Sequence, residues 1–225
     1  MAFSGDLYPF LSDLADHNER EWFQANKRRY EQSVKEPALQ FIRDFEPHLK
    51  AISPEFRAIA KASGGSLFRI YRDTRFSKDK SPYKTHTGVQ FRHTRGKDAH
   101  APGFYLHLQP GEVGAAVGIW HPENKVLNRI RDAIVAEPDR WGALKDDLAS
   151  SGRWEWFGES LKRAPRGYDP DHPYIDDLKR KSVGVWTKLT EAETVAPDFV
   201  EHYAAICAEG APVAAFACEA LGLAF

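Results

Sequence analysis

Four short segments in which apolar and polar residues alternate restrict the fold more than any other feature of the sequence. They are Phe68 to Tyr71, Thr87 to Arg92, Phe104 to Gln109 and Val113 to Trp120. Successive side chains of a β-strand point to opposite faces, so each segment predicts a half-buried strand. Parallel strands would need crossover connections, usually helices, and no helical pattern separates these segments. We therefore expect one mainly antiparallel sheet.

The alternation also predicts which residues share a face of this sheet. One face is apolar and should pack against helices; it contains Phe68, Ile70, Val89, Phe91, Phe104, Leu106 and Leu108. The other face is polar and contains Arg69, Tyr71, Gln90, Arg92, Tyr105, His107 and Gln109. Two interpretations of the polar face remain open, because it is either solvated or covered by further chain as the lining of a pocket. In the second case Tyr105 and His107 form a candidate proton-transfer pair.

Helical periodicity flanks the predicted sheet on both sides. Before it, we expect a helix from Leu7 to Leu14, a second that opens with a capping box of Asn18 and Glu21, and a third that begins at Pro37. After it, helices are expected from Pro122 and from Pro138, near Tyr174 to Arg180, and over Phe199 to Cys207 and Val213 to Leu221, with a strand over Val183 to Leu189.

These elements predict a single α+β domain over residues 1–225. Its mainly antiparallel sheet of four or more strands should pack with N-terminal and C-terminal helices. The N-terminal helices fall in 4–52 and the sheet core in 66–120. A C-terminal helical part with one further strand occupies 121–225.

Composition places the chain among globular proteins. Its 225 residues are 42% hydrophobic and 12% aromatic, which is too apolar for a disordered chain. No apolar run approaches the roughly 18 residues of a membrane span, and the first residues lack the pattern of a signal peptide. Cys207 and Cys218 are expected to be small buried residues rather than a disulfide or metal ligands. We expect a cytoplasmic protein without a membrane partner.

Positive charge is concentrated in one part of the chain. From Arg69 to Lys97 there are nine Lys and Arg against two acids, a local net charge of +7, whereas the whole chain has −1. We call the stretch from Arg69 to Lys84 the basic block. Arginines bind phosphate or carboxylate through two parallel hydrogen bonds, and lysines add mobile charge. Alternatively, Asp73 and Asp79 pair with neighbouring cations and the remaining cations are solvated.

The candidate site follows from the basic block and the polar sheet face. Candidate ligand-binding residues are Arg69, Tyr71, Arg72, Arg75, Lys78, Lys80, Tyr83, Lys84, Arg92 and Arg131. Candidate catalytic residues are Asp73, which would orient the arginines or act as a base, with Tyr105 and His107. A second basic stretch, Leu161 to Asp169, is either a lid over this block or a rigid surface loop.

These residues favour binding of, or catalysis on, an anionic and phosphate-bearing small molecule. The alternative is a non-catalytic module that docks an acidic protein or a nucleic acid. Because the rest of the chain is acidic overall, we expect only weak, salt-sensitive nucleic-acid binding, and Arg92, Arg95 and Lys97 extend the basic surface for it.

His86, His93, His100 and His107 recur every seven residues but match no metal motif, so no metal site is predicted. The cofactor, the oligomeric state and whether the chain is an enzyme stay open.

The sequence also resembles a bacterial and fungal family known as domain of unknown function 2461. The resemblance rests on Phe10-Leu11, Leu14, Asn18, Glu21-Trp22-Phe23, Asn26-Lys27, Tyr30, Phe68-Arg69-Ile70, Arg72-Asp73, Arg75 to Lys80, Pro82-Tyr83-Lys84, Gly118, Trp120, Pro122, Leu127, Ile130-Arg131, Pro165, Gly167-Tyr168 and His172-Pro173. It covers nearly the whole chain, and the central motif is the most specific part. The resemblance implies family membership and no particular activity.

Overall fold

An antiparallel sheet organises the computed structural model, which describes residues 3–96 and 101–225. In this described part the sheet has six strands in the order β1-β2-β3-β4-β6-β5. The strands are β1 (Phe56–Arg57), β2 (Thr87–His93), β3 (Gly103–Gln109), β4 (Glu112–Ile119), β5 (Glu155–Trp156) and β6 (Val183–Leu189). The expected α+β class and the antiparallel pairing are confirmed.

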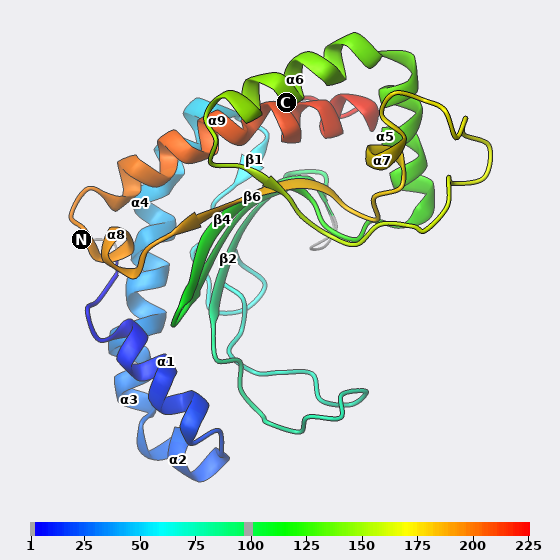
Figure 1. Cartoon of the computed structure of the whole chain (residues 1–225). Helices are drawn as coiled ribbons and strands as arrows, with labels where there is room; N and C mark the ends of the chain where they lie inside the picture. The colour runs from blue at the N-terminus through cyan, green and yellow to red at the C-terminus, as the bar shows by residue number, and fades with distance from the viewer. Residues whose placement is uncertain (1–2, 97–100) are drawn as a thin grey trace.

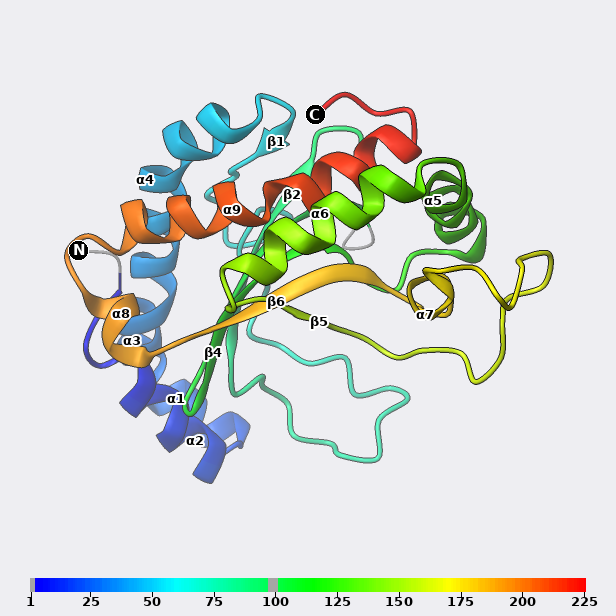
Figure 2. The same cartoon turned by 45° about the horizontal axis from the view of Figure 1, so that its top comes forward.

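Helices from both ends of the chain cover one face of this sheet (Figures 1 and 2). The N-terminal elements are α1 (Leu7–Asp16), α2 (Arg20–Ala25), α3 (Lys27–Tyr30), the π-helical segment η1 (Glu31–Lys35) and α4 (Glu36–Ile52). The later ones are α5 (Asn124–Ala136), α6 (Pro138–Ser150), α7 (Ile175–Leu178), α8 (Glu191–Val195) and α9 (Phe199–Ala220). Helix α9 crosses β4 and β6 and contacts α4, so it closes the core.

The core lies between the sheet and these helices. Val89, Phe91, Phe104, Leu106 and Leu108 of β2 and β3 are all fully buried, as their alternation predicts. Aromatic rings fill the space opposite them, with ring centroids 4.7 Å apart for Phe45 and Phe91 and 4.9 Å apart for Phe45 and Tyr203. Cys207 and Cys218 are free and buried in α9, which confirms their apolar role.

The segment from Phe68 to Tyr71 departs from the prediction, because it forms no regular strand. Isolated bridges join Leu67 to Val89 and Tyr71 to Tyr83. The bridge puts Leu67 on the side of Val89, so the register is shifted by one residue and Phe68 lies on the opposite face. Assigning Phe68 to the helix-covered face was therefore wrong, although Ile70 is buried as expected.

Three further expectations are corrected. Asn18 forms no capping box, because its side chain bonds to the backbone of Tyr83 instead. The two expected C-terminal helices are one, since α9 continues through Pro212 with buried residues on both sides. The C-terminal part contains two strands rather than one, because the two-residue β5 pairs with β6. The two-residue β1 was also missed, and an element this short carries no periodic signal.

Candidate functional site

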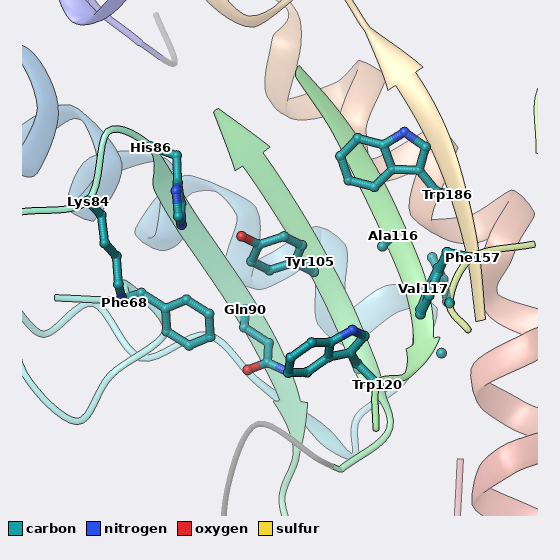
Figure 3. Close-up of a pocket in the computed structure, with 13 residues that line it drawn as sticks. Phe68, Lys84, His86, Gln90, Tyr105, Ala116, Val117, Trp120, Phe157 and Trp186 are labelled. Carbon is teal, nitrogen blue, oxygen red and sulfur yellow. The ribbon is translucent and has the colours of Figure 1, made fainter. Parts of the chain in front are cut away.

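A cavity of about 700 Å³ lies on the sheet face that the helices do not cover. Register places Gln90, Tyr105, Ala116 and Trp186 side by side across β2, β3, β4 and β6, and these residues form its floor. Figure 3 shows the walls, which are Phe68, Lys84 and His86 on one side, Trp120 at one end, and Phe157 opposite. We call this space the aromatic cavity.

Small residues on this face create the hollow. In β4 the residues facing the helices are Val113, Ala115, Val117 and Ile119, whereas those facing the cavity side are Gly114, Ala116 and Gly118. A Cβ atom at Gly114 would lie 2.2 Å from the Trp186 ring, and one at Gly184 would lie 2.4 Å from the Phe157 ring. Glycine therefore lets these two rings lie directly on the sheet.

Aromatic side chains give the cavity its mainly apolar lining. Trp120 is 55% exposed. It precedes His121, whose φ of 42° is unusual for a residue other than glycine. The His121 backbone N–H donates to Ser182 Oγ over 2.9 Å, which holds this turn in place. An exposed apolar ring above a concave surface is typical of a ligand site.

The polar end of the cavity contains Tyr105, His86 and, behind them, His107. Tyr105 Oη lies 3.0 Å from His107 Nδ1, and the His86 and His107 ring centroids are 4.7 Å apart. Burial lowers the pKa of His86 to about 4, lowers the pKa of His107 and raises the pKa of Tyr105. All three groups are therefore neutral at pH 7.

Lys84 is the one lysine or arginine among the described residues that line the aromatic cavity, and no Asp or Glu is among them. Its Nζ lies 5.3 Å from the centroid of the Phe68 ring. Burial, followed by the nearby charge of Arg69, lowers the pKa of Lys84. In the described part of the chain no carboxylate forms an ion pair with it. The cavity thus carries a partly buried cation that has no counter-ion among the residues that the structure describes.

The N-terminal helices hold Lys84 in this position. Asn18 Nδ2 donates to the Tyr83 carbonyl and Asn18 Oδ1 accepts from the Tyr83 N–H, both over 3.0 Å. The Tyr83 ring stacks on Phe23 with 4.1 Å between centroids. On the other side, the Lys84 N–H donates to the Ile70 carbonyl over 2.7 Å. The backbone on both sides of this lysine is therefore fixed.

Most of the basic block lies outside the aromatic cavity. Asp73 pairs with Arg75, with 2.7 Å between Oδ2 and Nη2, and Asp79 pairs with Arg72. The hydrogen bond from Arg75 holds the pKa of Asp73 at about 2, so this carboxylate is a poor base at neutral pH. Lys80 Nζ donates to a backbone carbonyl of the same loop. The internal pairing that we considered as the alternative is what the structure contains.

The remaining predicted residues lie in different surroundings. Arg69 is exposed and Lys78 points into solvent, and neither lines a cavity described here. Arg92 lies in β2 and is paired with Arg57 of β1 and Gly103 of β3. Arg131 is buried and donates to the carbonyls of Leu178 and Arg180, so it joins α5 to the α7 region.

Two smaller cavities adjoin the basic block. One of about 410 Å³, which we call the polar cavity, is lined by Ala15, Asn18, Arg72, Asp79, Ser81, Tyr83, Lys84, Thr85 and His86. Another of about 400 Å³ is lined by Arg20, Gln24, Tyr71, Arg72, Thr74, Pro82 and Tyr83. Lys84 and His86 line both the aromatic and the polar cavity, so these two spaces share a wall.

The second basic stretch does not act as a lid in this structure. Tyr168 Oη donates to Asp132 Oδ1 of α5 over 2.8 Å, and none of residues 161–169 lines the three cavities.

Lys97 and His100, which the sequence analysis named, lie outside the described residues. Among the described residues no group of three or more His, Cys, Asp or Glu could hold a metal ion. Within the same residues, no helix combines the length and apolar character needed to cross a membrane.

Sequence reasoning found Tyr105 and Lys84 but missed His86, Trp120, Phe157 and Trp186 as cavity residues. The alternation of large and small residues in β4 was the available signal, because a strand with one face of glycine and alanine leaves room above it.

No curated protein and no solved structure is significantly similar to the chain. The family described as "Conserved hypothetical protein (DUF2461)" matches residues 6–216. The chain therefore belongs to the DUF2461 family.

Proposed function

We propose that the chain binds a small anionic molecule with a planar, apolar body in the aromatic cavity. One observation carries this proposal: Lys84 is partly buried at the end of the cavity and has no carboxylate partner in the described part of the chain. A cation removed from water without a counter-ion is destabilising. An anionic group on the ligand would supply the missing counter-ion and two or three charge-assisted hydrogen bonds.

The lining supports a planar body for this ligand. Phe68, Trp120 and Phe157 surround a hollow whose floor contains Ala116 and the ring of Trp186. Aromatic rings favour offset-stacked or edge-on contacts with other rings, and each such contact contributes about 0.5–1.5 kcal/mol. A volume near 700 Å³ is within the range of pockets for drug-sized molecules.

The neutral groups beside Lys84 support orientation of the ligand. Tyr105 Oη and the His86 ring reach the same end of the cavity, and neither carries charge at pH 7. They can donate or accept hydrogen bonds next to the anionic group, and because they are neutral they do not act as further counter-ions beside Lys84. This arrangement favours a small-molecule site over a module that docks an acidic protein or a nucleic acid through the exposed loop. Arg72 and Arg75 of that loop are each paired with an acid of the same loop.

Calorimetric titration with a matched pair of ligands tests the proposal. Indole-3-acetate and indole-3-acetamide share a ring system and differ in charge. We expect wild-type protein to prefer the acetate by roughly tenfold or more, because a hydrogen bond to a charged group contributes about 1.5–3 kcal/mol. Lys84→Met should remove this preference while it retains binding of the amide.

Lys78→Met provides the control, because Lys78 is exposed on the same loop and lines no described cavity. This variant should keep the preference for the acetate. Equal affinity of wild-type protein for both ligands would contradict the proposal. An undiminished preference in Lys84→Met would contradict it as well, because the charge would then be recognised elsewhere.

A further inference from the structure

The polar cavity next to the aromatic cavity indicates what the anionic group is. Its lining contains two cations, Arg72 and Lys84, and one acid, Asp79, so its net charge is +1. Hydroxyl groups of Ser81 and Thr85 add to this lining. Lys84 and His86 are the side chains shared with the aromatic cavity. A ligand that passes these two residues would therefore have an apolar end in one space and a charged end in the other.

Asp79 offsets the charge of Arg72, and the charge of Lys84 remains as the net charge of the polar cavity. Its Oδ1 accepts from the backbone N–H and the hydroxyl of Ser81, over 2.9 and 2.6 Å, and its Oδ2 accepts from Arg72 Nη1. Both carboxylate oxygens are thus occupied by the loop itself. The ion pair fixes the guanidinium in the cavity wall, with a side-chain exposure of 28%.

Arg72 retains donors for a ligand. Its side chain donates to Asp79 through Nη1, so among the described residues the edge formed by Nε and Nη2 is unoccupied. This edge of a guanidinium matches two oxygens of a phosphate. A carboxylate would be satisfied by Lys84 alone, whereas a phosphate monoester carries nearly two negative charges at pH 7 and needs a second cation.

We propose, building on the function proposed above, that the ligand is an aromatic phosphate ester whose ring occupies the aromatic cavity and whose phosphate binds between Lys84 and Arg72 in the polar cavity. A short flexible connector passes His86. Arg72 acts as a phosphate-specificity residue, and Lys84 contacts the anionic group of either a carboxylate or a phosphate. The loop of the basic block therefore contributes one arginine to the site, held in place by Asp79.

Two indole derivatives of similar length test this assignment. The first is 4-(indol-3-yl)butyrate and the second is 3-(indol-3-yl)propyl phosphate. We expect wild-type protein to bind the phosphate at least about tenfold more tightly than the carboxylate, since the second cation adds charge-assisted hydrogen bonds. Arg72→Gln should abolish this difference and leave the affinity for indole-3-acetate within about twofold, because a single carboxylate is bound by Lys84.

Arg75→Gln is the matched control, because Arg75 carries the same charge, pairs with an acid of the same loop and lines no described cavity. It should preserve the preference for the phosphate. Equal binding of the two long ligands by wild-type protein would overturn the assignment, as would an equal loss of preference in both arginine variants. Loss of indole-3-acetate binding in Arg72→Gln would overturn it too, because Arg72 would then shape the first cavity.

These outcomes are separate from the failure of the function proposed above. If wild-type protein does not distinguish indole-3-acetate from its amide, the aromatic cavity is not the anion site and both proposals fall. If it distinguishes them through Lys84 but shows no preference for the phosphate, only the aromatic phosphate ester is rejected.

Discussion

Adjacent alanines in β4 allow a direct comparison of the two sheet faces. Ala115 is fully buried under α9, whereas Ala116 forms part of the floor of the aromatic cavity. Replacing either with valine adds two carbon atoms to the same strand. At Ala115 these atoms enter a packed core, and overpacking should lower the free energy of unfolding by about 1–3 kcal/mol.

At Ala116 the added atoms enter a hollow of about 700 Å³. Complete burial of two methylene-sized groups would contribute about 1.6 kcal/mol, and partial burial in an open cavity about half of that. Valine also suits a strand better than alanine. Ala116→Val should therefore raise the free energy of unfolding by about 0.5–1 kcal/mol. The two variants should differ by about 1.5–4 kcal/mol.

Urea unfolding followed by far-ultraviolet circular dichroism measures this difference. The slopes of the transitions should agree with the wild-type slope, so that midpoints report stability. If Ala116→Val is as destabilising as Ala115→Val, the face opposite the helices is packed and the cavity does not exist. A preserved affinity of Ala116→Leu for indole-3-acetate would also refute the assignment of the ligand to this space.

Two other predictions concern residues around the polar end of the cavity. Asn18→Ala should lower the free energy of unfolding by about 1–3 kcal/mol, because it removes both hydrogen bonds to the Tyr83 backbone. The control is Asn124→Ala, which changes an exposed asparagine and should leave the free energy of unfolding nearly unchanged. If chemical unfolding shows a loss below about 0.3 kcal/mol for Asn18→Ala, these two bonds do not hold Tyr83 in place. The pKa of His86 is held at about 4, below its ordinary value of 6.5, so its neutral form is favoured in the folded state. Its contribution to stability is complete above pH 6.5 and is lost as the pH falls toward 4. Between pH 7 and 4.5 the free energy of unfolding should fall by about 1–2 kcal/mol more in wild-type protein than in His86→Gln, a value reduced because the ring is partly exposed. Parallel plots of the free energy of unfolding against pH for the two proteins would refute this.

The sheet was predictable because its signal is local. Strands β2, β3 and β4 show a period of two, and the predicted segment Val183 to Leu189 coincides with β6. The same period failed at Phe68, because the bridge of Leu67 to Val89 sets the register and the neighbouring residues do not reveal it. Asn18 likewise had an attractive local partner in Glu21 but bonds to Tyr83, 65 residues later.

The candidate site was predictable only in part. A cluster of cations is visible in the sequence, but which cation lacks an acidic partner depends on how the loop folds back on itself. Arg75 is neutralised by an acid two residues away, whereas Lys84 lies under Phe68 beyond the reach of the loop acids. Trp120, Phe157 and Trp186 converge from three separate segments. Their convergence follows from the sheet order and from no pattern within any one segment.

A crystal of the protein soaked with 4-iodobenzoate would test the central claim most directly, because iodine is located by its anomalous scattering. The account predicts one principal site, with the iodine among Trp120, Phe157 and Trp186. The carboxylate should lie about 2.7–2.9 Å from Lys84 Nζ. An iodine on the exposed loop around Phe76, or a carboxylate bound by Arg69 or Arg75 while the aromatic cavity holds only solvent, would contradict it.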